Sequence, residues 1–175
     1  YTWLPDAYAE SPTGVSAFLS GTVTVTAIIA LLKALSSVIW SANQWGILLI
    51  VIALLNITLG NLLAIRQSEL KRVLAYSSVG HIGYIMFAAG IGIASQSLPG
   101  MRASILHLVM HGLMKSSGFF IVGAFAFALK RDNGNPLQIK DLNGVFNRYP
   151  GMTMALVISL LSLAGIPLTA GFISK

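Results

Sequence analysis

Five long apolar stretches, nearly free of charge, limit what this 175-residue chain can fold into. About 20 apolar residues cross the hydrocarbon core of a bilayer as a helix, and lipid satisfies no backbone polar group that lies outside a helix or closed barrel. Charged residues make up 9% of the sequence, compared with about 25% in soluble domains. We therefore expect an all-α integral membrane protein, a polytopic bundle of about five transmembrane helices. The expected spans cover about residues 13–32, 46–64, 73–94, 103–129 and 150–175.

The last expected span, 150–175, contains a predicted helix break at Gly165–Pro167. Proline removes a backbone hydrogen bond and kinks or ends a helix. Unwound backbone at membrane depth is tolerated where protein buries it or where it lines a water-filled cavity, and it recurs at transporter sites. Lys175 follows Pro167 by eight residues. Two interpretations are open for Lys175: a lysine that reaches the membrane surface from a helix end, or a proton-binding group beside the break.

The fourth expected span carries three ionisable residues at i, i+4 and i+8, namely His107, His111 and Lys115. Neighbours in this series lie roughly 6 Å apart along a helix axis, and each step turns about 40° around it, so the three form one stripe. Ionisable residues inside a membrane helix are costly and usually mark ion pathways or proton relays. We favour a proton path over the alternative that these side chains only bond neighbouring helices.

Other polar residues in the expected spans have two possible roles. His81, in the third span, either lines a path or bonds a carbonyl group, and the structural role is slightly favoured. In the first span, Ser20 and Thr24 are hydroxyl groups that either order water along a path or bond the backbone.

The sequence offers little to hold a metal or a cofactor. His107 and His111 have the spacing of two helical zinc ligands, but no carboxylate lies nearby, so we expect no metal site. The chain contains no cysteine, which excludes disulfides and cysteine-ligated iron–sulfur clusters. No glycine-rich nucleotide loop or nucleophile triad is present either. We therefore expect this chain to bind no cofactor itself.

The net charge of +6 is distributed unevenly between the two ends of the expected helices. The segments 1–12, 65–72 and 130–149 share one side and carry seven basic residues, whereas the other side has Lys33 and Arg102. Basic residues concentrate on the cytoplasmic side of membrane proteins. This asymmetry predicts that the three segments are cytoplasmic loops, or face the matrix or stroma in an organelle. It is a signal of membrane topology, and nucleic acid is not an expected partner.

The expected domain organisation follows from the residues at the two ends of the chain. The chain begins at Tyr1 without a signal peptide, and it ends at Lys175 within an apolar segment. We expect residues 1–175 to form a single transmembrane domain, an internal piece of a longer subunit.

Several motifs together resemble one family, the antiporter-like membrane subunits of the proton-pumping NADH dehydrogenase (complex I), of Mrp-type cation/proton antiporters and of membrane-bound hydrogenases. The resemblance rests on four stretches in the family's order: WLPDAYAESPTGVSAFLSG (3–21), SELKRVLAYSSVGHIGY (68–84), HLVMHGLMK (107–115) and LSLAGIPLTAGFISK (161–175). It implies a fold of two inverted five-helix repeats, each with a broken helix, of which this chain is most of the second.

The resemblance also implies roles for particular residues. The His107–His111–Lys115 helix corresponds to the family's central hydrophilic axis, and Lys175 corresponds to the lysine or glutamate of the second broken helix. Many members carry a histidine or lysine in the helix after the WLPDA motif, but the candidate positions here are Ser20 and Val25. Either water bridges this gap or the coupling between the two halves is altered.

The function expected from these features is proton translocation in a redox-driven respiratory or photosynthetic complex of the NADH:quinone oxidoreductase type. NADH or another donor, iron–sulfur clusters and quinone are then expected on partner subunits, in an energy-coupling membrane. The expected partners of this chain are the lipid bilayer and other membrane subunits of the complex, including related antiporter-like subunits. The alternatives are a multisubunit sodium/proton antiporter, a proton-pumping hydrogenase and a degenerate structural subunit. Sodium prefers oxygen ligands, ideally carboxylates. Because no acidic residue lies inside any expected span, we do not expect these spans to bind sodium.

Overall fold

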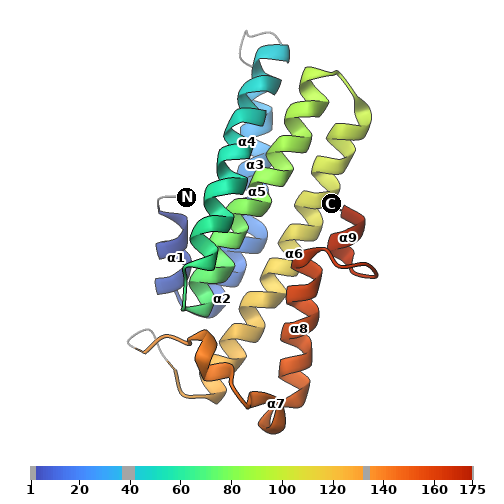
Figure 1. The fold of residues 1–175 in the computed structure, drawn as a ribbon. Coiled ribbons are helices and arrows are strands. Elements are labelled where there is room, and N and C mark those ends of the chain that lie inside the picture. Colours follow the sequence, from blue (N-terminus) through green and yellow to red (C-terminus); the bar gives the residue numbers. More distant parts are fainter. Residues whose placement is uncertain (1–2, 37–41, 132–134, 175) are drawn as a thin grey trace.

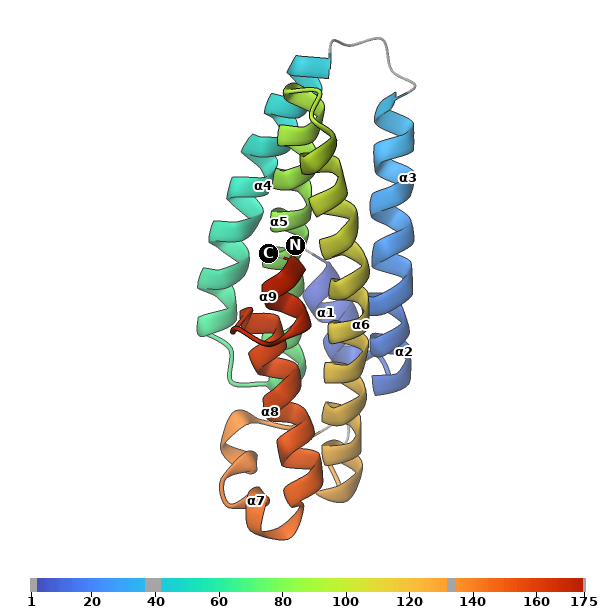
Figure 2. The ribbon, with the colours of Figure 1, turned by 90° about the vertical axis from the view of Figure 1, so that its right-hand side faces the viewer.

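The computed structural model describes residues 3–36, 42–131 and 135–174, and its named elements are all helices. Within these residues, four helices are long and apolar enough to cross a membrane. They stand side by side as an elongated bundle, with two short C-terminal helices packed against it (Figures 1 and 2). The chain therefore has the all-α, polytopic membrane fold that the sequence predicts.

The first membrane-length helix is continuous but contains one wider turn. It consists of α2 (Thr13–Phe18), the π-helical turn η1 (Leu19–Val23) and α3 (Thr24–Ser36). The Thr24 hydroxyl donates to the Leu19 carbonyl oxygen five residues earlier, at 2.9 Å, which stabilises the wider turn. Such π-bulges appear frequently at functional sites.

The second and third membrane-length helices, α4 (Ala42–Ile65) and α5 (Leu70–Ala94), pack against each other through glycines. A Cβ atom at Gly83 would lie 2.9 Å from the carbonyl oxygen of Ala53. At the other end, a Cβ atom at Gly90 would lie 2.8 Å from the carbonyl oxygen of Gly46. Small residues allow this close approach, because membrane helices associate through tight packing rather than through the hydrophobic effect.

The fourth, α6 (Leu98–Ala128), is the central helix of the bundle. It contacts α5, α2, α8 and α9, and it begins five residues earlier than the expected start at residue 103. Pro99 lies in its first turn, where the missing N–H group of proline costs nothing. Fully buried side chains of its second half, including Phe119 and Phe125, form the main apolar core with residues of α2, α5 and α8.

The predicted break of the last span at Gly165–Pro167 is present. Helix α8 (Pro150–Ala164) has 15 residues and ends at Gly165, which adopts the left-handed conformation with φ 79°. Helix α9 (Ala170–Ser174) follows after a short non-helical link and lies beside the middle of α6 (Figure 2). At ~1.5 Å per residue, α8 is about 22 Å long, shorter than the ~30 Å hydrocarbon core.

The segment 1–12, expected as a loop, instead forms the short helix α1 (Leu4–Glu10) over most of its described part. Tyr8 buries its ring in the bundle core, and Lys71 donates to the carbonyl oxygens of Ala9 and Ser11 at 3.2 and 2.9 Å. Arg72 pairs with Asp6 at 2.6 Å. The helix forms because α5 supplies these partners, which the local sequence does not show.

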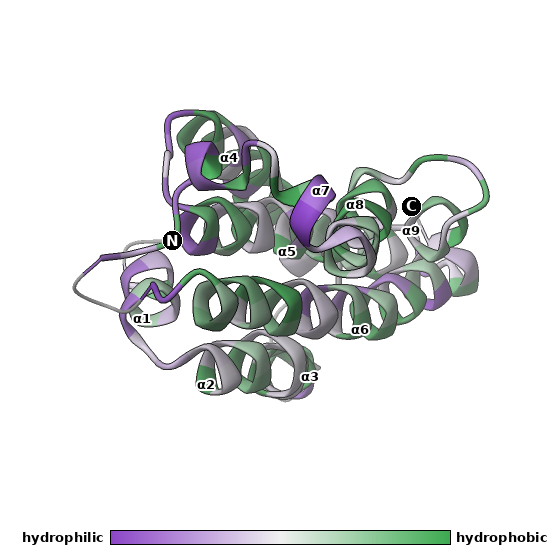
Figure 3. Ribbon diagram, turned by 90° about the horizontal axis from the view of Figure 1, so that it is seen from below, coloured by the Kyte–Doolittle hydropathy of each residue, from purple (hydrophilic) through white to green (hydrophobic). Residues whose placement is uncertain are grey.

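The other two segments expected as loops are also partly helical. Between α4 and α5 the link is only residues 66–69, so half of the expected loop 65–72 is helix. The segment 130–149 contains η2 (Ile139–Leu142) and α7 (Val145–Arg148). Viewed along the bundle, apolar residues dominate the long helices, and polar residues gather on α7 and the connecting segments (Figure 3).

Candidate functional site

The three ionisable residues of α6 are buried in the interior of the bundle. The exposed fractions of His107, His111 and Lys115 are 3%, 0% and 0%. Helical spacing places them on one stripe of α6, and their partners come mainly from α5. Since a buried polar group has to be hydrogen-bonded or it destabilises the fold, these partners determine what the stripe can do.

His107 is the centre of a hydrogen-bonded chain that crosses three helices. Its Nε2 atom lies 3.2 Å from Nδ1 of His81 on α5, and the two rings stack with centroids 5.4 Å apart. Its Nδ1 atom lies 2.9 Å from the hydroxyl oxygen of Ser174 on α9. The structure therefore brings His81 together with the α6 stripe, and it adds Ser174, which the sequence did not single out.

His111 lies next to this chain but outside it. Its ring centroid is 5.5 Å from that of His81. Both of its ring nitrogens are buried and have no hydrogen-bond partner among the described residues. An unsatisfied buried polar group costs about 1–3 kcal/mol, and such groups in native proteins call for an explanation such as a catalytic role or bound water.

Lys115 has its ammonium group against the backbone and a hydroxyl of α5. Its Nζ atom donates to the Leu74 carbonyl oxygen at 2.8 Å and to the Ser77 hydroxyl at 2.5 Å. Ser77 and His81 are four residues apart, so α5 presents a ladder at the same spacing as the stripe on α6. This shared spacing was visible in the sequence, but nothing local showed that the two helices face each other.

The broken helix is fitted closely to the site. A Cβ atom at Gly171 would overlap the carbonyl oxygen of Ser162, so α9 approaches the end of α8 more closely than any other residue allows. The Gly171 amide also donates to the Ser162 hydroxyl at 3.3 Å. In turn, the Ser162 hydroxyl contacts the sulfur of Met114 on α6 at 3.0 Å. These contacts hold Ser174 beside His107.

Ser20 and Thr24, the hydroxyl groups of the first span, belong to a separate cluster near α1. Ser20 donates to the Ala17 carbonyl oxygen at 3.3 Å, within its own helix. Thr24 contacts the Tyr8 hydroxyl at 2.7 Å, and the Tyr8 ring packs edge-on against Phe119. Burial raises the pKa of Tyr8, and the hydrogen bond between Tyr8 and Thr24 offsets part of this rise.

The ion pairs lie away from the stripe. The carboxylates of Asp6 and Glu69 pair with Arg72, and Asp141 pairs with Arg131. In the ranges that the structure describes, no cluster of three or more histidine and acidic side chains is arranged to hold a metal ion. Lys175, the other predicted proton-path residue, lies outside the described residues.

Comparison with known proteins places this chain in a family. The family described as "NADH:quinone oxidoreductase/Mrp antiporter, TM" matches residues 1–175, the whole chain. The chain belongs to this family. It is thus an antiporter-like integral membrane protein.

A solved structure supports the same assignment. The chain is similar to one in the membrane-bound sulfane sulfur reductase, described as an archaeal respiratory membrane complex, with 29% sequence identity and a TM-score of 0.83. The match covers 99% of this chain and 34% of the other, so this chain spans about a third of that relative's length.

Proposed function

We propose that this chain is a proton-translocating, antiporter-like subunit of a redox-driven respiratory or photosynthetic membrane complex. The observation that carries the proposal is the group of buried, mutually close ionisable side chains at the centre of the bundle. His81, His107, His111 and Lys115 come from two packed helices. Grouped ionisable residues within membrane helices are typical of proton relays.

The arrangement is chemically suited to moving protons. Each neutral imidazole has one nitrogen that donates and one that accepts, so a contact between two rings can pass a proton. His111, whose two ring nitrogens have no hydrogen-bond partner among the described residues, is suited to bind water between the histidine pair and Lys115. A proton on one group changes the proton affinity of the next, because charges interact strongly at low dielectric.

The redox chemistry in this proposal belongs to other subunits. The chain has no cysteine for cluster ligation and no glycine-rich nucleotide loop. NADH or another donor, iron–sulfur clusters and quinone are therefore assigned to partners. The archaeal relative is a sulfane sulfur reductase, so a complex of this kind also operates with another redox reaction. The proposed partners are membrane subunits of the same complex, including related antiporter-like chains.

The proposal is tested with the parent complex reconstituted in liposomes. The protons pumped per electron are compared between wild type, Lys115→Ala and Lys175→Ala, with the exposed Lys140→Ala as the control for loss of a lysine. We expect at least about a tenfold loss of pumping in the first two variants, since one positioned proton-transfer group contributes roughly 10²–10⁴-fold to a rate. Lys140→Ala should behave as wild type. Unchanged pumping in Lys115→Ala would mean that the stripe is structural, and uptake that depends on sodium would favour the antiporter alternative.

A further inference from the structure

Ser174 joins the broken helix to the histidine pair through a single hydroxyl group. This hydroxyl is buried, with 6% of the residue exposed, and lies between two groups. One is Nδ1 of His107 at 2.9 Å, and the other is the Gly171 carbonyl oxygen at 3.3 Å. A serine hydroxyl has one hydrogen to donate, so it donates to one of the two groups at a time.

This choice determines the direction of the whole chain of hydrogen bonds. When Ser174 donates to Gly171, it accepts from Nδ1–H of His107, whose Nε2 atom then accepts from Nδ1–H of His81. When Ser174 donates to Nδ1 of His107, Nε2–H of His107 donates to Nδ1 of His81 instead. The two arrangements carry the same number of protons and have opposite polarity.

We propose that the Ser174 hydroxyl selects the tautomer of His107, and thereby the direction in which the chain of hydrogen bonds from His81 through His107 to Ser174 passes a proton. This inference rests on the proposed proton-translocating function. Converting one arrangement into the other brings one proton in at Nε2 of His81 and releases one from the Ser174 hydroxyl, with water as donor and acceptor. The proton count on the three side chains is therefore unchanged.

The position of α9 controls whether Ser174 reaches His107, and therefore which tautomer of His107 is favoured. Ser174 is the last residue of α9, and α9 is held against α8 through Gly171 and Ser162. Moving α9 away from α6 would break the contact between the Ser174 hydroxyl and Nδ1 of His107. The helix break thus allows a short segment to change the histidine tautomer without moving the long helices.

The test uses the intact complex in liposomes and compares Ser174→Ala with Ser174→Thr. The matched control is Ser104→Ala, because Ser104 is a buried serine on α6 whose hydroxyl donates only to the Ile85 carbonyl oxygen, at 3.0 Å. We expect Ser174→Ala to lower the protons pumped per electron about tenfold, the loss expected for one hydrogen bond of ~1.4 kcal/mol. Ser174→Thr and Ser104→Ala should stay within about twofold of wild type, since both keep the bond to His107.

Each other outcome has a defined meaning. If Ser174→Ala pumps as well as Ser104→Ala, or if Ser174→Thr is as impaired as Ser174→Ala, Ser174 does not position His107 through its hydroxyl and the inference is overturned. If Lys115→Ala retains full pumping, the proposed function fails, and the inference fails with it. If Lys115→Ala loses pumping while Ser174→Ala does not, only the inference is wrong.

Discussion

At the scale of single residues, two histidines one helical turn apart have opposite environments. His107 has a partner on each ring nitrogen, Ser174 on one and His81 on the other. His111 is fully buried, and both of its nitrogens lack a partner among the described residues. The fold therefore gains hydrogen bonds from the first imidazole and pays the cost of burying the second without any.

This contrast predicts different effects of replacing each histidine with leucine. His107→Leu removes the hydrogen bonds that His107 makes with His81 and Ser174, and we expect it to destabilise the fold by about 1–3 kcal/mol. His111→Leu removes unsatisfied groups, and we expect stability within about 1 kcal/mol of wild type, or above it. The temperature at which the detergent-solubilised complex dissociates measures both effects.

The same two variants separate stability from function. Both should lose proton pumping in liposomes, although only His107→Leu should lower the dissociation temperature. An equal loss of stability in His111→Leu would show that His111 has structural partners, and would contradict its proposed role as a water-binding group.

At the scale of elements, the break between α8 and α9 depends on residues that tolerate unusual backbone or close contact. Gly165 has φ 79°, a conformation that costs a side-chain-bearing residue about 1–2 kcal/mol. Gly171 leaves no room for a Cβ atom beside the Ser162 carbonyl oxygen. Gly165 therefore ends α8, and Gly171 allows α9 to lie against it.

We expect Gly171→Ala to displace α9 and so to separate Ser174 from His107. Pumping should fall about as far as in Ser174→Ala, roughly tenfold, while the complex still assembles. Gly151→Ala is the control, because Gly151 lies on α8, the helix that Gly171 contacts, and a Cβ atom there meets nothing within 4 Å. The measurement is again the number of protons pumped per electron, with assembly checked by native gel. Full pumping in Gly171→Ala would mean that α9 does not need its close contact with α8.

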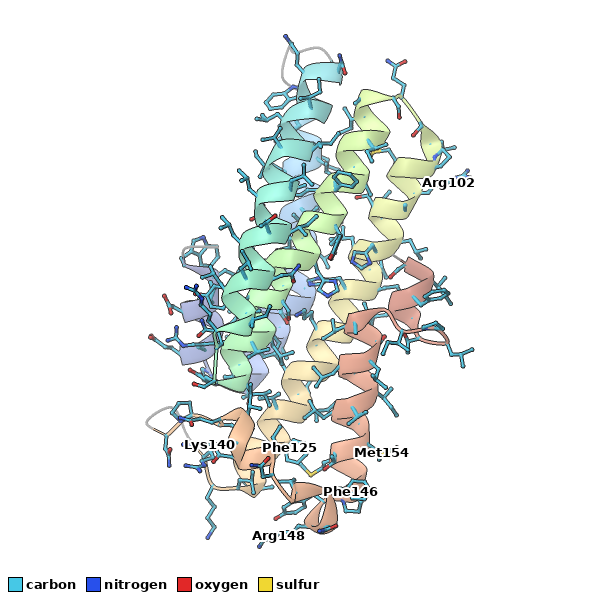
Figure 4. All side chains as sticks on the ribbon, viewed as in Figure 1. Arg102, Phe125, Lys140, Phe146, Arg148 and Met154 are labelled. Atoms are coloured by element: carbon cyan, nitrogen blue, oxygen red, sulfur yellow. The ribbon has the colours of Figure 1, made fainter. Side chains whose placement is uncertain are left out.

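At the scale of the whole molecule, basic residues gather at one end of the bundle. Lys140 and Arg148 lie at this end, and Arg102 lies toward the other (Figure 4). Two other arginines hold segments of the chain together, since Arg72 pairs with Asp6 and Arg131 with Asp141. The charge asymmetry favours a cytoplasmic location for the basic end.

Because the chain has no cysteine, its orientation is open to direct labelling. We expect a membrane-impermeant maleimide added outside intact cells to label Arg102→Cys and not Lys140→Cys, both of which replace exposed residues. Permeabilised cells should label both variants and provide the control for reactivity. The reverse pattern would place the basic end outside and contradict the positive-inside prediction.

Much of the fold follows from local sequence. Apolar length predicts the long helices, and Gly165 with Pro167 predicts the break. The predictions were less accurate at the ends of elements. Pro99 begins a helix rather than preceding one, and the segment expected as an N-terminal loop is helical because Lys71 and Arg72 bind it from α5. These ends depend on partners that are distant in sequence.

The sequence by itself determined that the chain spans the membrane, and that His107, His111 and Lys115 share one face of a helix. Hydropathy and helical periodicity are local properties, so the order of residues is sufficient to show them. Only the tertiary structure decided which groups this face meets. Ser77 and Ser174 are 38 residues before Lys115 and 67 residues after His107, respectively. A hydrogen bond requires about 3 Å between two atoms, and distances of that kind are set by how the helices pack.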